Sequence, residues 1–364
     1  MKLIFVIDSL GSGGAQRLLV NLVNSLSSDF SIAILLYNPK VDFFSGNLNS
    51  DLQLIKLKVQ DHSGFSLDKL VSICRIISNY DIVISFLPAA NIYVSLARIF
   101  VRSIYHISCE FSVVHSGESR LRRTLANIAC ILSSFVVTNS YTQSAYIQSL
   151  PFMSKKVSTI WNGIYPSSFS KPSSPIKPKI LIPARISSPK NGVRLVRALN
   201  LFYHRNGYLP HVSWAGRQDS DVLSLRMRAE MNQQLASNAL LNAHFSFLGE
   251  VSDINALYSE YPIVLLPSIY EGVPNVICEA MFSGSIVIAS GVSDNTLILG
   301  DNCERGIVCD PLSPLSICIA IEKCLSLQQN EILSIISKAR QFALQNFTVD
   351  SMSGKYLSLL RSLS

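Results

Sequence analysis

Two carboxylates stand eight positions apart in a chain that carries few charges. Glu271 and Glu279 lie in the stretch "SIYEGVPNVICEAMFSG" at 268–284, and only 15% of all residues are charged. An apolar segment typical of a strand precedes the first acid, and we expect a helix to begin near Pro274 or Asn275. Carboxylates accept hydrogen bonds from sugar hydroxyls, and amides at a helix N-terminus attract phosphate. The spacing therefore predicts a site for a nucleotide-sugar, with one acid for the hexose and the other for the ribose.

Two cations follow another expected strand. Arg185 and Lys190 stand five positions apart in the short polar loop "ARISSPKNG" at 184–192. The guanidinium of Arg binds phosphate through a planar fork, and Lys adds a point charge. The pair could clamp a diphosphate against the other half of the chain. Two exposed loop cations without a ligand would give the same pattern.

A glycine-rich loop lies near the N-terminus. The segment "DSLGSGGAQR" at 8–17 places Gly11, Gly13 and Gly14 just before an expected helix. Glycine lets backbone amides approach an anion closely at such a position. The loop therefore indicates either a phosphate site or a plain tight turn. Its spacing does not match the dinucleotide fingerprint G-x-G-x-x-G, which disfavours a dehydrogenase.

Strand-like and helical segments alternate along the chain. This alternation predicts parallel sheets with helices on both faces and ligands beyond the carboxyl ends of the strands. A break rich in Pro and Ser at 163–179 separates two such series, so we expect domains at 1–168 and 169–345 and a last helix at 346–364. The expected strands are 2–7, 31–37, 81–87 and 134–140 before the break, and 179–185, 211–216, 244–250, 261–267 and 285–290 after it.

The composition is apolar, and the sequence disfavours a disulfide-bonded, a membrane-spanning or a secreted protein. Hydrophobic residues make up 48% of the chain, and its eight Cys include no C-x-x-C pair, which indicates buried thiols in a reducing compartment. No segment is typical of a membrane span, because the nearest, 82–101, contains Pro88, Asn91 and Arg98. The start "MKLIFVID" is too short for a secretory signal.

Positive charge gathers in the first half. The formal net charge is +7, and residues 1–170 hold 14 Lys and Arg against 9 Asp and Glu. The clusters predict either a solvated face or attraction to an anionic membrane surface or acceptor. We expect no nucleic-acid partner, because no recognised binding motif accompanies them. The clusters are Arg98 with Arg102, Arg120 with Arg122 and Arg123, and Lys155 with Lys156.

Five motifs in order resemble one family. "GSGGAQR" is similar to its Gly-Gly-Ala loop, "IWNGI" at 160–164 to its "PNGID" junction, "PARISSPKNG" to its "GRLxxxKG", "FLGEVSDINALY" to its base-binding segment, and "YEGVPNVICEAM" to its E-x7-E pattern. Together they resemble the retaining nucleotide-sugar glycosyltransferases of the GT-B fold, a group that includes bacterial lipopolysaccharide, capsule and O-antigen enzymes. The resemblance covers nearly the whole chain. It implies two Rossmann-like α/β domains that face across a cleft, with a C-terminal helix returning to the first.

The resemblance also implies roles for the matching residues. Arg185 and Lys190 would neutralise the departing diphosphate, Glu271 would hold the transferred sugar, and these three would be the catalytic residues. Glu279 would hold the ribose. The remaining substrate-binding residues would be Gly13 and Gly14 at the donor phosphates, Gly249 and Glu250 around the base, and Gly272, Val273, Pro274 and Asn275, whose amides would face the sugar.

One position near the transferred sugar departs from the family. Many relatives carry a His there, and this chain reads "HISCEFSVVHSGESR" at 106–120. His106, Glu110 and His115 are all candidates. The expected strand end favours Glu110 over His115, and His106 follows an apolar run that indicates burial.

A D-x-D signature, which binds metal in a different glycosyltransferase fold, occurs at Asp219 and Asp221. It directly precedes an expected helix, where Asp is an ordinary cap. Magnesium needs several oxygen ligands, and no further acids stand nearby in the sequence. We therefore expect no metal here.

The resemblance implies a retaining, metal-independent hexosyltransferase without a cofactor. It would move a sugar from a nucleotide-sugar, UDP being favoured over GDP, to an oligosaccharide or lipid-linked acceptor in bacterial surface polysaccharide biosynthesis. The protein would work in the cytoplasm, at the inner face of the inner membrane. Two other classes share the sequence features: a sugar-nucleotide epimerase of the same fold, and a non-catalytic sugar-nucleotide-binding protein.

Overall fold

The computed structural model describes residues 1–58, 65–111, 120–167, 169 and 178–363. The chain forms two compact units. The first contains Met1–Ile164 and Asn346–Ser364, and the second contains Tyr165–Gln345. The break expected at 163–179 lies largely outside the described residues.

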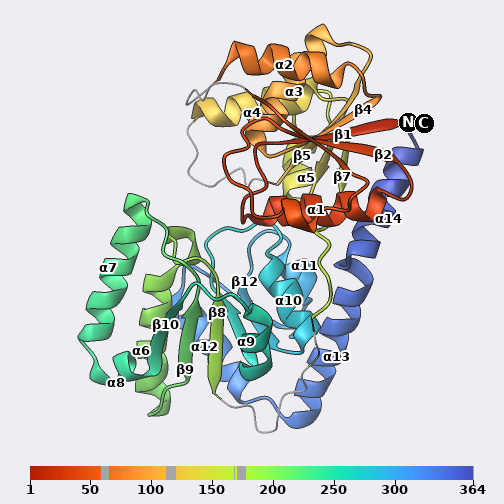
Figure 1. Cartoon of the computed structure of the whole chain (residues 1–364). Helices are drawn as coiled ribbons and strands as arrows, with labels where there is room; N and C mark the ends of the chain where they lie inside the picture. The colour runs from red at the N-terminus through yellow and green to blue at the C-terminus, as the bar shows by residue number, and fades with distance from the viewer. Residues whose placement is uncertain (59–64, 112–119, 168, 170–177, 364) are drawn as a thin grey trace. The chain divides into compact units, whose positions relative to one another are not determined.

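The first unit is a parallel sheet with helices around it (Figure 1). Its strand order is β3-β2-β1-β4-β5-β6-β7, so the order reverses between β1 and β4. The strands are β1 (Lys2–Ile7), β2 (Ser31–Leu36), β3 (Gln53–Lys56), β4 (Ile82–Phe86), β5 (Tyr105–Glu110), β6 (Phe135–Thr138) and β7 (Val157–Thr159). The helices are α1 (Gly14–Leu26), α2 (Leu67–Ile77), α3 (Pro88–Phe100), α4 (Arg120–Leu132), α5 (Tyr141–Gln148) and α14 (Val349–Arg361).

The second unit repeats this plan. Its strand order is β10-β9-β8-β11-β12-β13, with the reversal between β8 and β11. The strands are β8 (Lys179–Pro183), β9 (His211–Ala215), β10 (Phe245–Gly249), β11 (Ile263–Leu266), β12 (Ile286–Ser290) and β13 (Ile307–Cys309). The helices are α6 (Gly192–Asn206), α7 (Val222–Ala236), α8 (Ala239–His244), α9 (Ile254–Glu260), α10 (Asn275–Ser283), α11 (Asn295–Leu299), α12 (Pro314–Leu325) and α13 (Gln329–Asn346).

The prediction of parallel α/β sheets is confirmed in both units. In a sheet of this kind, ligands bind beyond the carboxyl ends of the strands where the strand order reverses. Four loops occupy those places: the glycine-rich loop after β1, the Leu87 turn after β4, the cationic loop after β8, and the Glu271 loop after β11. The fold thus brings the predicted functional residues of each unit to one edge of its sheet.

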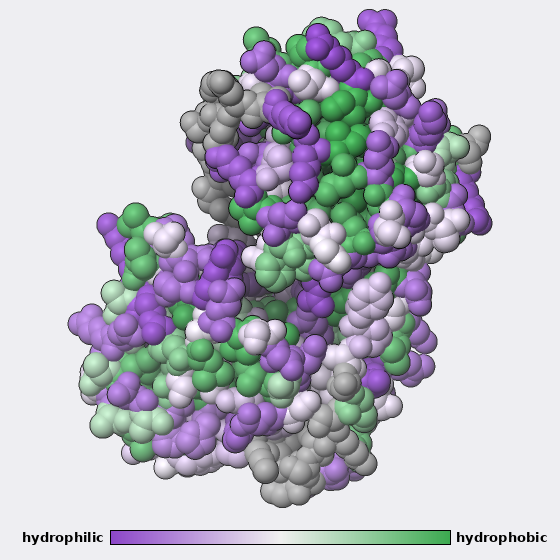
Figure 2. Space-filling model, viewed as in Figure 1, coloured by the Kyte–Doolittle hydropathy of each residue, from purple (hydrophilic) through white to green (hydrophobic). Residues whose placement is uncertain are grey.

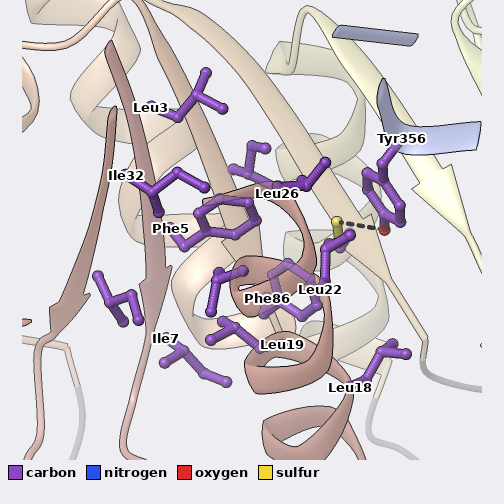
Figure 3. Packing of buried hydrophobic residues seen from close by; sticks show 14 of the residues in the cluster. Leu3, Phe5, Ile7, Leu18, Leu19, Leu22, Leu26, Ile32, Phe86 and Tyr356 are labelled. Carbon is purple, nitrogen blue, oxygen red and sulfur yellow. Dashed lines mark hydrogen bonds between the residues drawn. The ribbon is translucent and has the colours of Figure 1, made fainter. Parts of the chain in front are cut away.

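Strands buried on both faces explain the apolar composition. All residues of β1 after Lys2 and all residues of β4 are buried. The leucines of α1 recur at helical spacing and pack on the sheet, where Phe5 and Phe86 lie with ring centroids 6.1 Å apart (Figure 3). Apolar patches also remain among hydrophilic residues on the outer surface (Figure 2), as is usual for soluble folds.

The last helix completes the core of the first unit. Val349, Met352, Tyr356 and Leu360 recur every three or four residues on α14 and are all buried in that core. The hydroxyl of Tyr356 lies 3.5 Å from the sulfur of Cys109 on β5 (Figure 3). The segments 1–164 and 346–364 are therefore one packing unit although they are far apart in sequence.

Two further sequence predictions can be compared with the described residues. All eight cysteines are free, and six of them are buried, as predicted; Cys74 and Cys303 are partly exposed. None of the helices in the described part of the chain is long and apolar enough to cross a membrane.

We expect Tyr356→Ala to lower the free energy of unfolding of the first unit by about 3–5 kcal/mol, because it opens a cavity in a packed core. Urea unfolding followed by Trp161 fluorescence, in a Trp214→Phe background, measures this, since the chain has two Trp. Tyr356→Phe is the control and should cost less than about 1 kcal/mol, because it removes only the long contact to Cys109. Equal costs for the two variants would contradict the packing role.

Candidate functional site

Asn191 ties the loops at the carboxyl edge of the second sheet together. Its buried side-chain amide donates to the carbonyl oxygens of Pro267, at 2.9 Å, and Pro311, at 2.7 Å. The backbone of Asn191 is left-handed, with φ of 64°, a conformation that Asn tolerates better than most residues. The amide of Ile269 also donates to the carbonyl of Pro189 at 2.8 Å. The loops after β8, β11 and β13 are thus held in one arrangement.

Lys190 and Glu271 form an ion pair across these loops. The ammonium of Lys190 donates to Oε1 of Glu271. Their side chains are only 17% and 12% exposed, so solvent screens this pair less than a surface pair. The sequence predicted both residues at this edge but not their direct contact.

Arg185 stands in a more open place. Its guanidinium pairs with Asp219 at 2.5 Å, and its side chain is 58% exposed. The start of its loop is fixed by the neighbouring strand β9, because the indole nitrogen of Trp214 donates to the carbonyl of Ala184 at 2.7 Å. A Cβ on Gly216 would lie 2.1 Å from that same carbonyl oxygen, so only Gly fits there.

The D-x-D signature has two separate local roles. Oδ1 of Asp221 accepts the amides of Leu223 and Ser224 and caps α7, as the sequence predicted. Asp219 pairs with Arg185. Among the described residues, no group of three or more His, Cys, Asp and Glu could hold a metal ion.

The helix expected after Glu271 begins at Asn275, within the predicted range. Pro274 is its N-cap, in extended conformation, and makes no side-chain capping hydrogen bond. Gly272 and Val273 complete the loop before it. This leaves the amide end of α10 beside the Glu271 loop, an arrangement that favours a negatively charged ligand.

Glu279 lies in the second turn of α10, as predicted. Its Oε2 accepts a hydrogen bond of 2.9 Å from the hydroxyl of Tyr258 on α9. Tyr258 is buried, so its hydroxyl fixes the Glu279 carboxylate from the interior of the unit. The sequence analysis did not single out Tyr258, although "FLGEVSDINALY" contains it.

Gly249 is the last residue of β10, the outer strand that pairs with β9, and Glu250 follows it. Gly249 has φ of 71°, and its carbonyl accepts the amide of Gly216 at 2.7 Å. Glu250 is exposed at the same edge. Both therefore lie at the carboxyl ends of the strands of the sheet that carries Arg185.

The glycine-rich loop of the first unit ends at the start of α1. Gly13 is the N-cap and no side chain caps the helix, so its first amides are not satisfied by a capping side chain. A Cβ on Gly13 would lie 2.2 Å from Oε1 of Gln16, the far end of a flexible side chain. Gly14 is the first helical residue. The amides at the start of α1 suit an anion.

The three candidates for the sugar-facing position differ in their surroundings. His106 is completely buried, as its sequence context indicated, and Glu110 is buried at the carboxyl end of β5. Burial and, to a smaller degree, the charge of Arg98 lower the pKa of His106 to about 3. His115 lies outside the described residues. Of the two described candidates, Glu110 is the one at the ligand-binding edge.

Comparison with known proteins agrees with this geometry. Residues 177–327 match the family described as "Glycosyl transferases group 1". Those residues are a glycosyltransferase group 1 domain. The domain contains both ion pairs, the D-x-D signature and α10.

The whole chain is also similar to other proteins. An α-1,4-N-acetyl-D-galactosaminyltransferase of Campylobacter jejuni, named for a GalNAc-containing diNAcBac-PP-undecaprenol substrate, is 22% identical over 99% of this chain and 98% of its own. The structure of Anabaena HepE in complex with UDP and glucose aligns over 100% of both chains with a TM-score of 0.80 and 20% identity. A glycosyltransferase from Rickettsia africae aligns with a TM-score of 0.78 over 99% and 98%, at 20% identity. The fold is therefore GT-B, as predicted.

The ion pairs Lys190–Glu271 and Arg185–Asp219 should differ in energy. We expect Lys190→Ala to lower the free energy of unfolding of the second unit by about 1–3 kcal/mol, because it leaves the half-buried Glu271 carboxylate without this partner. Arg185→Ala is the control and should cost less than about 1 kcal/mol, as an exposed pair does. Trp214 fluorescence in a Trp161→Phe background reports this unit.

The double variant Lys190→Ala/Glu271→Ala should cost less than the sum of its two single variants, because the two side chains interact directly. Additive costs would mean that the ion pair contributes nothing to stability.

Proposed function

We propose that this protein is a retaining hexosyltransferase that moves a sugar from a nucleotide-sugar to a lipid-linked glycan in the synthesis of a bacterial surface polysaccharide. The observation that carries the proposal is the ion pair between Lys190 and Glu271, beside the amide end of α10, in a glycosyltransferase group 1 domain. A cation for phosphate and a carboxylate for sugar hydroxyls meet there.

A sugar diphosphate would exchange partners with this ion pair. Its phosphate oxygens would take the ammonium of Lys190, and its sugar hydroxyls would donate to the carboxylate of Glu271. Each charge that the protein holds in the half-buried loop would then gain a new partner as it loses the old one. Such an exchange avoids leaving a buried charge unpaired, which is costly.

The chemical step would depend on stabilising the leaving group. The bond between the anomeric carbon and the phosphate oxygen breaks, and an acceptor oxygen attacks from the same face. The acceptor's proton passes to the departing phosphate oxygen. Lys190 and Arg185, with the amides at the start of α10, would stabilise the charge that develops on the diphosphate. Arg185 would have to leave Asp219 for this task, and its exposed position leaves room for that movement.

No metal ion enters this mechanism. Asp221 of the D-x-D signature already caps α7, and the two cations would supply the positive charge that a metal would otherwise bring. We therefore propose transfer that needs no divalent cation.

We propose UDP as the nucleotide carrier, with GDP second. The support is that HepE, which has the same fold, was solved in complexes with UDP and with UDP-glucose. The base would lie near Gly249 and Glu250, and Glu279, held by Tyr258, would accept from the ribose. The lipid-linked acceptor follows the name of the Campylobacter relative.

A membrane-bound acceptor requires a surface that can lie against lipid, and we propose α4 for this role. Leu121, Leu125 and Ile128 follow one another at helical spacing and are 69%, 40% and 45% exposed. Arg120 and Arg122 are exposed on the same helix. An apolar stripe beside cations is typical of helices that bind at a membrane interface. Arg98 does not join them, because its guanidinium donates to the carbonyl of Leu132 at 2.6 Å.

Transfer assays with labelled nucleotide-sugars and a polyprenyl-diphosphate glycan test the reaction. We expect Lys190→Ala and Arg185→Ala each to lower turnover by about 10²-fold or more, the scale of one lost transition-state contact. Turnover should persist in excess chelator, and Asp219→Ala should change it less than either cation variant does. Epimerised product, or binding without any turnover, would replace the proposal by one of the other two classes.

Liposome co-sedimentation tests α4. Arg120→Glu/Arg122→Glu should weaken binding to anionic vesicles, and high salt should do the same to the unmodified protein, because each cation contributes roughly 1 kcal/mol and salt screens it. The control Lys58→Glu/Arg75→Glu changes the net charge equally on other exposed parts of the unit and should bind normally. Leu121→Ser/Leu125→Ser should weaken binding at all salt concentrations. Equal losses in the control would mean that only net charge matters.

A further inference from the structure

A chain of buried polar side chains leads to Glu110. Ser85 on β4 and His106 on β5 are completely buried, Asn91 in the first turn of α3 is 1% exposed, and Glu110 is 3% exposed. Such groups are costly to bury unless they are hydrogen-bonded, and an apolar core would be simpler. The chain ends at a carboxylate on the edge of the sheet where ligands bind.

The chemistry of the partners fixes the direction of each hydrogen bond. The carbonyl of Cys109 can only accept, so the group of Asn91 that lies 3.0 Å from it must be the amide nitrogen. The same nitrogen lies 3.4 Å from Oε2 of Glu110. The amide oxygen of Asn91 must therefore face Ser85, whose hydroxyl donates to it at 2.6 Å.

His106 comes next in the chain. The only hydrogen of the Ser85 hydroxyl is used on Asn91, so at 2.8 Å from Nε2 of His106 this oxygen must accept. His106 must then carry its proton on Nε2. Its Nδ1 lies 3.4 Å from the hydroxyl oxygen of Ser95 and 3.3 Å from that of Ser133. Both hydroxyls also lie 2.8 Å from the carbonyl oxygen of Ala129, which can only accept, so one of them donates to Ala129 and the other donates to Nδ1. Burial keeps the ring neutral at pH 7, with a pKa of about 3.

The turn after β4 stores strain at the same place. Leu87 has φ of 78° and ψ of 150°, a region that is essentially restricted to glycine. Its carbonyl accepts the amide of Asn91 at 3.0 Å, which begins α3. Strain of about 1–3 kcal/mol persists only where the surroundings impose it, and it is frequent at ligand sites.

We propose that His106, Ser85 and Asn91 are positioning residues, which act as a hydrogen-bonded relay that fixes the Glu110 carboxylate for binding a sugar hydroxyl during transfer. The amide of Asn91 occupies one acceptor position of the carboxylate and so sets its plane. This inference rests on the proposed function. It assigns the buried His106 a role through Glu110, without contact with the sugar.

The tautomer of His106 tests the relay without any activity measurement. A long-range 1H–15N correlation spectrum of the 15N-labelled protein should show the His106 ring neutral at pH 7, protonated on Nε2 and bare on Nδ1. The His106→Gln spectrum, which lacks one of the six His, assigns the signal. A proton on Nδ1 would reverse the hydrogen bond to Ser85 and overturn the relay.

A double-mutant cycle tests whether the relay acts through Glu110. We expect Ser85→Ala and Glu110→Gln each to lower kcat/KM for transfer by about tenfold or more, and the double variant to be no worse than Glu110→Gln alone. Affinity for the free nucleoside diphosphate should stay unchanged in all three variants. His106→Gln, whose amide can still donate, should retain more activity than His106→Leu. Trp161 fluorescence and the melting temperature check that each variant folds.

The outcomes separate this inference from the proposed function. The relay would be overturned if the losses of kcat/KM in the two single variants multiplied in the double variant, or if they followed the melting temperature. The proposed transferase function would remain. An unmodified protein that transfers no sugar, but shows the Nε2 proton, would overturn the proposed function and with it the role in transfer, leaving a structural network only.

Discussion

The buried side chain of Asn191 is the interaction on which the site of the second unit depends. By donating to carbonyls that follow two other strands, it holds three loops at one edge of the sheet. Lys190 precedes it directly, so the position of the ammonium against Glu271 follows from that anchor. An Asn in left-handed conformation can do this because its side chain satisfies buried carbonyls that a Gly at the same place would leave without that partner.

The two cations of the loop after β8 have different environments, which suits different tasks. Lys190 is enclosed and already paired, so it can act as a fixed charge for a phosphate. Arg185 is largely in solvent, where a long side chain can change partners at little cost. The rigid support below Arg185, from Trp214 and the close approach of Gly216, means that this freedom belongs to the side chain and not to the loop.

In the first unit, the residues at the carboxyl ends of the strands are held in place by different interactions. Its core is completed by α14, which comes from the far end of the chain, so the strand that carries Cys109 and Glu110 packs against residues such as Tyr356. Within this apolar core, His106, Ser85 and Asn91 are connected by hydrogen bonds, which lowers the cost of burying them. The second unit thus positions its functional side chains with ion pairs, and the first unit does so with buried hydrogen bonds between neutral groups.

Local chemistry made much of the molecule predictable from sequence. Apolar runs of strand length marked β1 at its observed bounds and β8 to within two residues, because strands buried on both faces must be apolar. The start of α10, the cap at Asp221 and the place of Glu271 after a strand also follow from local rules. By contrast, β3 was not among the expected strands, because its four residues begin and end with a polar side chain and leave only two apolar residues between them.

Only the tertiary structure decided which partners these side chains have. The contacts of Lys190 with Glu271, Arg185 with Asp219 and Glu279 with Tyr258 join residues 21 to 81 positions apart, and no local rule selects one acid over another for a given cation. The membership of α14 in the first core depends on contacts nearly the full length of the chain apart. The sequence by itself determined the elements and the kinds of functional group, because these depend on neighbours along the chain. The pairing of the groups depends on neighbours in space.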